Sequence, residues 1–378
     1  MKHIKWKNLM LIGGVLILAS CTTNDSEELD LGLEVTNDKE VLNARMIQRN
    51  QPISISSSTN GRKEQDFELM LKAELQPPLV NGSALQATSI IQKGKFLAVS
   101  YNTAGEVYGG GIDLITEDLE VTSQALLESD INDLEFFANS LYFAGSTNSS
   151  SSPAFVGKVD VNTGKGEIKN STEVIQEVGS FTANSITEFE GVIYATTGDN
   201  ADLGGGVYRF STAMDLNNYQ SIEDARWVVG SGSYIYCLSG EPSKISALDR
   251  NNLDLVFTID HSSETLPEAK QTIDIDDDMI FVAGGEKGVL IYDEDGQLVK
   301  NLTFDGNSIT NAVSAEKGRL FISNGEGGVY VATYKKEIEI LGKLELNSKE
   351  SVNHILANGD YLYVASGLGG VKVIEIDD

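Results

Sequence analysis

Cysteine is almost absent from this sequence, which has only Cys21 and Cys237 in 378 residues. A framework of several disulfides is therefore excluded, and a chain of this length can rely on a buried apolar core instead. Cys237 lies within the apolar run YIYCL. We interpret it as a small buried hydrophobic side chain and not a nucleophile, because reactive cysteines lie in exposed, electropositive surroundings.

Histidine and tryptophan are also scarce, with three and two residues. No HExxH or paired-histidine spacing occurs, so the motifs of a zinc site are missing. The GxSxG elbow of a serine hydrolase is missing as well. The carboxylate-rich DIDDDM, Asp274–Met279, lacks the glycine and the distal glutamate of a calcium loop, and we interpret it as a turn between strands. We predict no cofactor, with calcium as the weak alternative.

Positive charge is in short supply, since 28 Lys and Arg face 56 Asp and Glu, which gives a formal net charge of -28. A chain this acidic repels the phosphates of nucleic acids and of anionic lipids, so we exclude nucleic acid as a partner. After the first 20 residues, no stretch is long and apolar enough for a transmembrane helix.

The first 20 residues have the layout of a signal peptide. Lys2, Lys5 and Lys7 precede the apolar stretch Leu9–Leu18, which is too short for a lasting membrane span. The stretch ends in LASC at Cys21, which resembles the lipobox of bacterial lipoproteins, where cleavage before the cysteine exposes it to acylation. We predict a signal peptide over residues 1–20 and a lipidated cysteine; the alternative is an ordinary secretory signal. Cleavage would remove three Lys and no acid, and would move the formal charge from -28 to -31.

Acidic residues follow closely, at Asp25, Glu27 and Glu28. This cluster resembles the surface-export signal of Bacteroidetes lipoproteins, and Thr22 stands where the inner-membrane retention signal of enteric bacteria has aspartate. The resemblance implies an outer-membrane protein that faces the exterior and meets the membrane through its lipid anchor. We interpret residues 21–66 as the lipidated cysteine and a flexible polar tether, with a short helix as an option within NDKEVLNARMIQRN.

From Phe67 onward, short runs rich in Val, Ile, Tyr and Phe alternate with clusters of Gly, Asn, Asp and Ser, which is typical of an all-β protein. One phrase returns: an apolar run, a small residue, a glycine pair and a second apolar run, as in YLYVASGLGGVKV. Its aligned positions in the first run are Ala98, Tyr142, Tyr194, Tyr236, Phe281, Phe321 and Tyr363. The copies recur about every 43 residues, which is the length of a propeller blade of four antiparallel strands.

The seventh copy has three strands and lacks the fourth. The segment FELMLKAELQ, Phe67–Gln76, resembles the fourth strand of the sixth copy, IEILGKLELN, Ile338–Asn347. We therefore predict a seven-bladed β-propeller over residues 67–378, closed by an N-terminal strand that completes the last blade. Pairing of the first strand with the last hides two sheet edges that would otherwise be free to pair with other chains.

The phrases YLYVASGLGGVKVIEID, MIFVAGGEKGVLIYDED and LFISNGEGGVYVATY resemble LVIVD-repeat propellers, whose blades pair a YVA-x-G strand with a GL-x-I-x-D strand. Copies five to seven match well, whereas copies one to three have longer loops and copy four lacks the glycine pair. The resemblance covers roughly residues 67–378. It implies the propeller fold and a secreted or surface location, and it implies no particular reaction.

Ten residues before each aligned position, where the innermost strand of a blade begins, every copy has a polar residue. Because innermost strands line the central channel, we predict a polar ring at one of its mouths, formed by Thr88, Asn132, Asn184, Arg226, Gln271, Asn311 and Asn353. One interpretation is a site for a polar ligand or ion, with Arg226 as the candidate contact for an anion. The other is that these side chains satisfy backbone groups and ordered water along the channel.

Three long loops join the second and third strands of the first three copies, at Asn102–Gly110, Ser146–Pro153 and Gly198–Gly205. Because they join equivalent strands, we expect them to cluster on one face. This favours a binding or scaffold module for a protein or glycan partner. The alternative is a hydrolase or lyase with its active site at the channel mouth.

Overall fold

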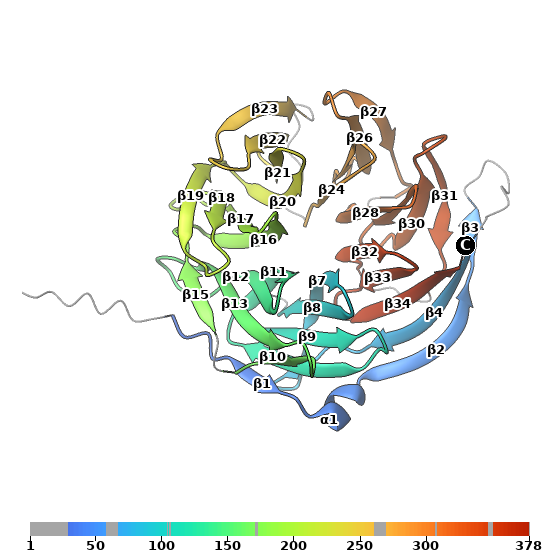
Figure 1. Ribbon diagram of the computed structural model, residues 1–378. Helices are drawn as coiled ribbons and strands as arrows, with labels where there is room; N and C mark the ends of the chain where they lie inside the picture. Colours follow the sequence, from blue (N-terminus) through green and yellow to red (C-terminus); the bar gives the residue numbers. More distant parts are fainter. Residues whose placement is uncertain are drawn as a thin grey trace, which may run out of the picture. The chain divides into compact units, whose positions relative to one another are not determined.

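Seven antiparallel sheets follow one another along the chain in the computed structural model and lie around a common centre (Figure 1). The structure describes residues 29–57, 67–103, 105, 107–170, 173–260, 270–306, 308–346 and 351–377. The predicted signal peptide, Cys21 and the acidic cluster after it lie outside the described residues. The prediction of a seven-bladed β-propeller is confirmed, with each sheet forming one blade.

Each of the first four blades contributes four strands in chain order, from the channel to the rim. Blade 1 has β7 (Gln86–Lys93), β8 (Phe96–Asn102), β9 (Gly110–Thr116) and β10 (Val121–Leu127), and blade 2 has β11 (Asp130–Phe137), β12 (Ser140–Ser146), β13 (Ala154–Asn162) and β15 (Val174–Glu177), with the short β14 (Glu167–Ile168) beside β13. Blade 3 has β16 (Thr182–Phe189), β17 (Val192–Gly198), β18 (Gly206–Phe210) and β19 (Leu216–Ser221), and blade 4 has β20 (Ala225–Ser231), β21 (Tyr234–Ser239), β22 (Lys244–Asp249) and β23 (Leu255–Asp260).

The last three blades follow the same plan, except that blade 7 takes its fourth strand from the beginning of the chain. Blade 5 has β24 (Ile273–Asp276), β25 (Met279–Ala283), β26 (Val289–Asp293) and β27 (Leu298–Leu302), and blade 6 has β28 (Ala312–Glu316), β29 (Arg319–Ser323), β30 (Val329–Thr333) and β31 (Glu339–Leu344). Blade 7 has β32 (His354–Asn358), β33 (Tyr361–Ala365), β34 (Val371–Asp377) and β4 (Glu68–Leu75), and a small hairpin of β5 (Leu79–Val80) and β6 (Ser83–Ala84) leads into blade 1.

The closure predicted from the sequence is confirmed by the register of β4 on β34. Leu75 lies opposite Val371, Ala73 opposite Val373, and the pairing continues to the end of both strands. β4 therefore occupies in blade 7 the fourth position that β31 occupies in blade 6, as the similarity of the two segments predicted.

The flexible tether expected over residues 21–66 is wrong for residues 31–57. Here the chain forms β1 (Glu34–Thr36), α1 (Lys39–Asn43), β2 (Met46–Ile53) and β3 (Ile55–Ser57). β1 pairs with β10 of blade 1, β2 with β4 of blade 7 and β3 with β31 of blade 6, so three blades gain a fifth strand (Figure 1). We name residues 31–57 the N-terminal strap.

The strap was mistaken for a tether because most of its side chains face water. Five consecutive residues of β2, Gln48–Pro52, are exposed, so the strand shows no apolar alternation. Its attachment comes instead from backbone hydrogen bonds to open sheet edges, together with the buried Leu31 and Leu42. The short helix is confirmed as α1, which begins after the N-cap Asp38 and is the only helix among the described residues. No described helix is long and apolar enough to cross a membrane.

The hydrophobic core is divided among the interfaces between neighbouring blades. Leu75, Val99 and Tyr363 belong to one cluster that joins blades 7 and 1, and similar clusters join each pair from blades 2 and 3 to blades 6 and 7. The second strand of each blade is covered on both faces, which explains its continuous apolar run. Cys237 lies in such a strand with no exposed surface, and burial raises the pKa of its thiol well above the ordinary value, so the prediction of a buried hydrophobic role is confirmed.

The recurring glycine pair serves the approach of the outermost strand. Gly370 has φ of +71°, and a Cβ atom there would lie 2.0 Å from the carbonyl oxygen of Leu75 in β4. Gly288 in blade 5 repeats this geometry against the carbonyl of Leu302 in β27. Only glycine combines this left-handed conformation with so close a backbone contact. In blades 5 and 7 the glycine of the phrase therefore lets the fourth strand approach at the same place.

Candidate functional site

Six of the seven ring residues predicted from the sequence line one cavity of about 1170 Å³ at the channel mouth: Thr88, Asn132, Asn184, Arg226, Gln271 and Asn353. Asn311, the seventh, is buried in the channel wall and does not reach the cavity. The cavity lies at the end of the propeller where innermost strands begin and second strands end. Asn102 and Asp199, at the first and third long loops, also line it.

Five ring residues each donate a hydrogen bond from their own blade to the next one, and we name this set the belt. In every case the side chain donates to the backbone carbonyl just before the ring residue of the following blade. The bonds run from Thr88 Oγ1 to Ile131 O (2.8 Å), Asn132 Nδ2 to Ala183 O (2.9 Å), Asn184 Nδ2 to Ala225 O (2.8 Å), Asn311 Nδ2 to Val352 O (2.8 Å) and Asn353 Nδ2 to Ala87 O (3.0 Å). Innermost strands are sheet edges, and their inward carbonyls need donors. For these five residues the interpretation as backbone partners is confirmed.

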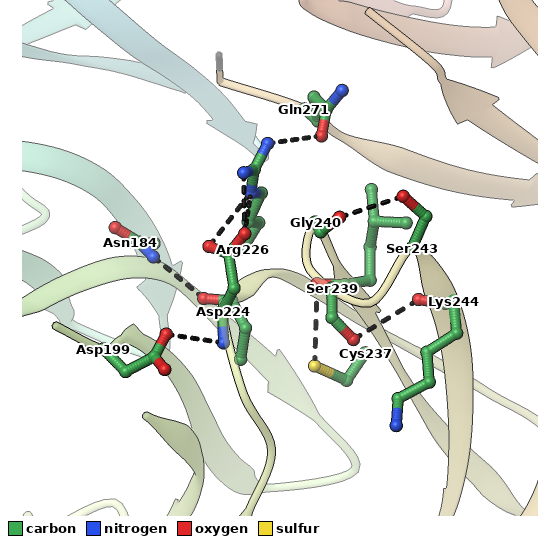
Figure 2. A network of polar contacts seen from close by, with 12 residues as sticks. Asn184, Asp199, Asp224, Arg226, Cys237, Ser239, Gly240, Ser243, Lys244 and Gln271 are labelled. Carbon is green, nitrogen blue, oxygen red and sulfur yellow. Dashed lines mark hydrogen bonds and ion pairs between the residues drawn. The ribbon is translucent and has the colours of Figure 1, made fainter. Parts of the chain in front are cut away.

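The belt changes character at Arg226 and Gln271 (Figure 2). Arg226 donates from Nη1 to Gln271 Oε1 at 2.7 Å. Its Nε and Nη2 donate to the carboxylate of Asp224 at 3.1 and 2.7 Å. The anion that the sequence suggested for Arg226 is thus supplied by the chain itself. A Cβ atom at Gly240 would lie 2.1 Å from the guanidinium carbon, so this position of the second loop of blade 4 must be glycine for the arginine to fit.

Gln271 does not continue the belt. Its side chain is 1% exposed, and its Nε2 has no hydrogen-bond partner among the described residues. The carbonyl that it would serve in the next blade, that of Thr310, accepts from the backbone N–H of Gly285. A buried amide donor is therefore left over at the wall of the cavity.

Lys270 is the functional residue that our sequence reasoning missed. It precedes β24 of blade 5, yet its Nζ donates to the carbonyls of Thr88 (2.6 Å) and Asn132 (2.8 Å) in blades 1 and 2. The same ammonium lies 5.4 Å from the ring centroid of Trp227 in blade 4, a cation–π arrangement. Burial lowers the pKa of Lys270 to about 8, an effect that the nearby Asp133 opposes.

A signal for Lys270 was present in the sequence. The residues just before the ring positions in the other six blades are Ala87, Ile131, Ala183, Ala225, Thr310 and Val352. A lysine in this uncharged column stands out, and comparing the columns beside the ring would have found it. What the sequence could not give is the direction of its side chain across the channel.

Deeper in the channel wall, buried acidic side chains accept the inward N–H groups of the next blade. Asp133 accepts from Ile186 N at 3.0 Å, Glu135 from Glu188 N at 3.3 Å and Asp274 from Ala315 N at 2.7 Å. Burial raises the pKa of all three carboxyl groups. His354 acts likewise, accepting from Ile90 N, and burial lowers the pKa of its imidazole so that it stays neutral.

The pKa of Glu135 gives a prediction for stability against pH. Burial raises it from 4.5 to about 7, so between these values the folded protein holds a proton that the unfolded chain has released. Stability must therefore fall as pH rises through this window, by up to about 3 kcal/mol for this group. Urea unfolding of Glu135→Gln should show a flatter pH dependence over this range than the wild type. Glu117→Gln, at an exposed turn, should keep the wild-type slope; equal slopes in both variants would contradict the prediction.

The segment Asp274–Met279, predicted to be a turn, is a turn only at Asp277 and Asp278, because Asp274–Asp276 belong to β24 and Met279 begins β25. Asp274 is half-buried in the channel wall, Asp276 accepts from the hydroxyl of Tyr334, and Asp277 pairs with Lys335 at 3.0 Å. The carboxylates thus have separate partners. Within the described ranges, no group of three His, Cys, Asp or Glu side chains lies close enough to hold a metal ion.

Comparison with solved structures finds the same fold at low sequence identity. The chain is similar to a catalytically inactive virginiamycin B lyase from Staphylococcus aureus with quinupristin (TM-score 0.61, 14% identity, 82% of this chain and 99% of that chain) and to the WD40 β-propeller domain of Doa1 (TM-score 0.57, 13% identity, 81% and 95%). It is also similar to the computationally designed protein Ika8 (TM-score 0.52, 10% identity, 87% and 97%). A scan of protein-family models and a search of the curated proteins find no match. At these identities the likeness extends to the fold, and the chain is a seven-bladed β-propeller.

Proposed function

We propose that this protein is a lipid-anchored binding module of the outer membrane, which presents the channel-mouth face of its propeller to a protein or glycan partner. The propeller is in general a scaffold for binding. The observation that supports the proposal is the polar cavity of about 1170 Å³ at the channel mouth, whose wall carries an unused amide donor at Gln271. Large concave sites with a few convergent polar groups are the usual places of ligand binding.

The long loops support the same face. Between the second and third strands of blades 1 to 3, the loops span residues 103–109, 147–153 and 199–205, so all three leave the propeller at the end where the cavity opens. Loop residues at Asn102 and Asp199 border the cavity itself. Partners that enter the cavity would therefore meet the loops as well.

The anchor and location rest on the sequence. The lysines before Leu9–Leu18, the LASC motif and the acidic residues after Cys21 support acylation and export to the cell surface. Labelling of cells with a radioactive or alkyne-bearing fatty acid should mark the wild type and leave Cys21→Ala unlabelled. Protease added to intact cells should digest the lipidated protein; protection of the protein would contradict display on the exterior.

The loop face can be tested by deleting Ser149–Ser152. These residues lie at the surface in a turn closed by a hydrogen bond from Thr147 N to Pro153 O, so the deletion should leave the melting temperature nearly unchanged. Capture of a surface partner by cross-linking on cells should weaken. If every captured partner is retained, the loop face is not the binding face.

The alternative of a hydrolase or lyase at the channel mouth stays a prediction. One structural neighbour is a lyase, but the likeness shows the fold alone. In this chain, Asp133, Glu135, Asp274 and His354 are each engaged with backbone N–H groups of the wall. The geometry supports binding better.

A further inference from the structure

The cavity at the channel mouth is rich in carboxylates. Asp199, Glu223, Asp224, Glu241 and Glu286 line it, against Arg226 and Lys270 as the basic side chains among its described lining residues. Both bases are engaged, Arg226 with Asp224 and Gln271, and Lys270 with two backbone carbonyls. The exposed Glu223 lies in the loop that joins blades 3 and 4, and the exposed Glu241 and Glu286 lie in loops of blades 4 and 5, so their negative charges add at the mouth and attract cations.

Gln271 supplies an independent sign that something binds. Because a guanidinium only donates, the contact with Arg226 fixes Oε1 toward the arginine, and Nε2 must point the other way (Figure 2). A donor that is 1% exposed and has no partner among the described residues is costly to leave unpaired. A ligand that brings an acceptor, such as a peptide carbonyl, would satisfy it.

The cavity already holds one ammonium group, that of Lys270. Backbone carbonyls of two blades and the face of Trp227 receive it. These acceptors are already used by Lys270, so a cation from a partner would meet the carboxylates at the mouth instead. The volume of about 1170 Å³ exceeds the usual range of about 300 to 1000 Å³ for small-molecule sites, which favours a segment of chain as the occupant.

We propose that the cavity binds a lysine- or arginine-bearing segment of a protein partner, whose side-chain cations meet Glu223, Glu241 and Glu286 while a backbone carbonyl accepts from Gln271 Nε2. This inference rests on the proposed binding function and names its partner chemistry. Carboxylates at the rim set the charge of the partner, and the amide donor at the wall sets where its backbone lies.

The first test is fluorescence anisotropy with a fluorescein-labelled peptide of alternating lysine and glycine, using the soluble chain from residue 29. Binding should weaken on addition of salt, and the variant Glu223→Gln/Glu241→Gln/Glu286→Gln should bind at least about tenfold more weakly. The matched control Glu117→Gln/Asp118→Asn/Glu294→Gln removes the same charge from exposed turns at the opposite end of the blades, and it should bind as the wild type does. Equal loss in the two variants, or equal binding of a glutamate–glycine peptide, would overturn the proposal.

The second test asks whether the amide donor of Gln271 contributes to peptide binding or whether charge alone accounts for it. Gln271→Glu keeps an acceptor for Arg226 but replaces the Nε2 donor by an oxygen. A site that works by charge alone would bind the lysine peptide more tightly in this variant, because a carboxylate has been added. A site that uses the donor should bind it on the order of tenfold more weakly. Tighter binding would therefore contradict the assignment of Gln271.

Titration with neutral oligosaccharides distinguishes failure of the basic-segment inference from failure of the proposed binding function. Cellohexaose and maltohexaose are titrated against the same proteins by calorimetry. Binding of a saccharide that is lost in Gln271→Glu, without any binding of the lysine peptide, would overturn the basic-segment inference and leave the binding function standing. Absence of binding for peptide and saccharide alike, with no partner cross-linked on cells, would overturn both.

Discussion

Removal of residues 1–75, which takes away β4, is expected to abolish the cooperative unfolding of the propeller. Leu69 and Leu75 are buried in the clusters that join blade 7 to blades 6 and 1, so the loss opens two interfaces at once. Each fully buried leucine contributes about 1.5 to 3 kcal/mol, and the edge of β34 would lose its partner strand. Together with the strap, this loss is comparable to the total stability of a typical domain, about 5 to 15 kcal/mol.

Two shorter truncations serve as controls, with unfolding followed by circular dichroism and calorimetry. Removal of residues 1–28 should leave the melting curve unchanged, because the described fold begins after them. Removal of residues 1–57 takes the strap but keeps β4, so the transition should stay cooperative and move to lower temperature. A chain that lacks β4 and still melts at the wild-type temperature with equal cooperativity would show that the ring does not depend on this closure.

Arg45→Met is expected to destabilise the protein by about 3 to 5 kcal/mol, because it would leave a buried charge unpaired. Arg45, between α1 and β2 of the strap, donates from Nη1 and Nη2 to both carboxylate oxygens of Asp113 in blade 1, at 2.9 and 2.7 Å. The Asp113 side chain has no exposed surface, and its remaining described partner is Nε2 of Gln124. The buried Tyr101 lies in the same group, and burial raises the pKa of its hydroxyl.

A neighbouring ion pair on the same strap provides the matched control. Arg49 and Glu74 pair with side chains 35% and 24% exposed, so Arg49→Met should cost less than about 1 kcal/mol. The double variant Arg45→Met/Asp113→Asn removes the charge left behind and should recover part of the lost stability in urea unfolding. Similar effects of Arg45→Met and Arg49→Met would mean that burial of Asp113 does not decide the outcome.

The number of blades and the closure of the ring could be predicted because short, local sequence patterns specify both. Each blade repeats the same sequence of strands and glycine turns, and Gly370 and Gly288 mark the entry of the fourth strand in copies 82 residues apart. The segment of β4 carries the pattern of an outermost strand. Hydrophobic periodicity and turn residues depend on residues that are close together in the sequence, so a single sequence is enough to detect them.

The ring residues were found by the same repeat, but their roles were not fixed by it. A polar residue at each blade predicted a ring, and the structure uses Thr88 and four asparagines to bind backbone carbonyls of the next blade. At Gln271 the same position leaves a donor unused. Residue type alone does not distinguish these cases, because the difference depends on which partners the closed ring brings to each side chain.

The sequence by itself determined the seven-fold repeat, the strand that closes it and the polar column at the channel. Only the tertiary structure decided that residues 31–57 bind three blade edges and that Lys270 reaches across the channel to blades 1 and 2. The physical reason is common to both. A sheet edge is bound through backbone groups that every residue carries, and the partners of Lys270 are backbone carbonyls brought near only when the ring closes.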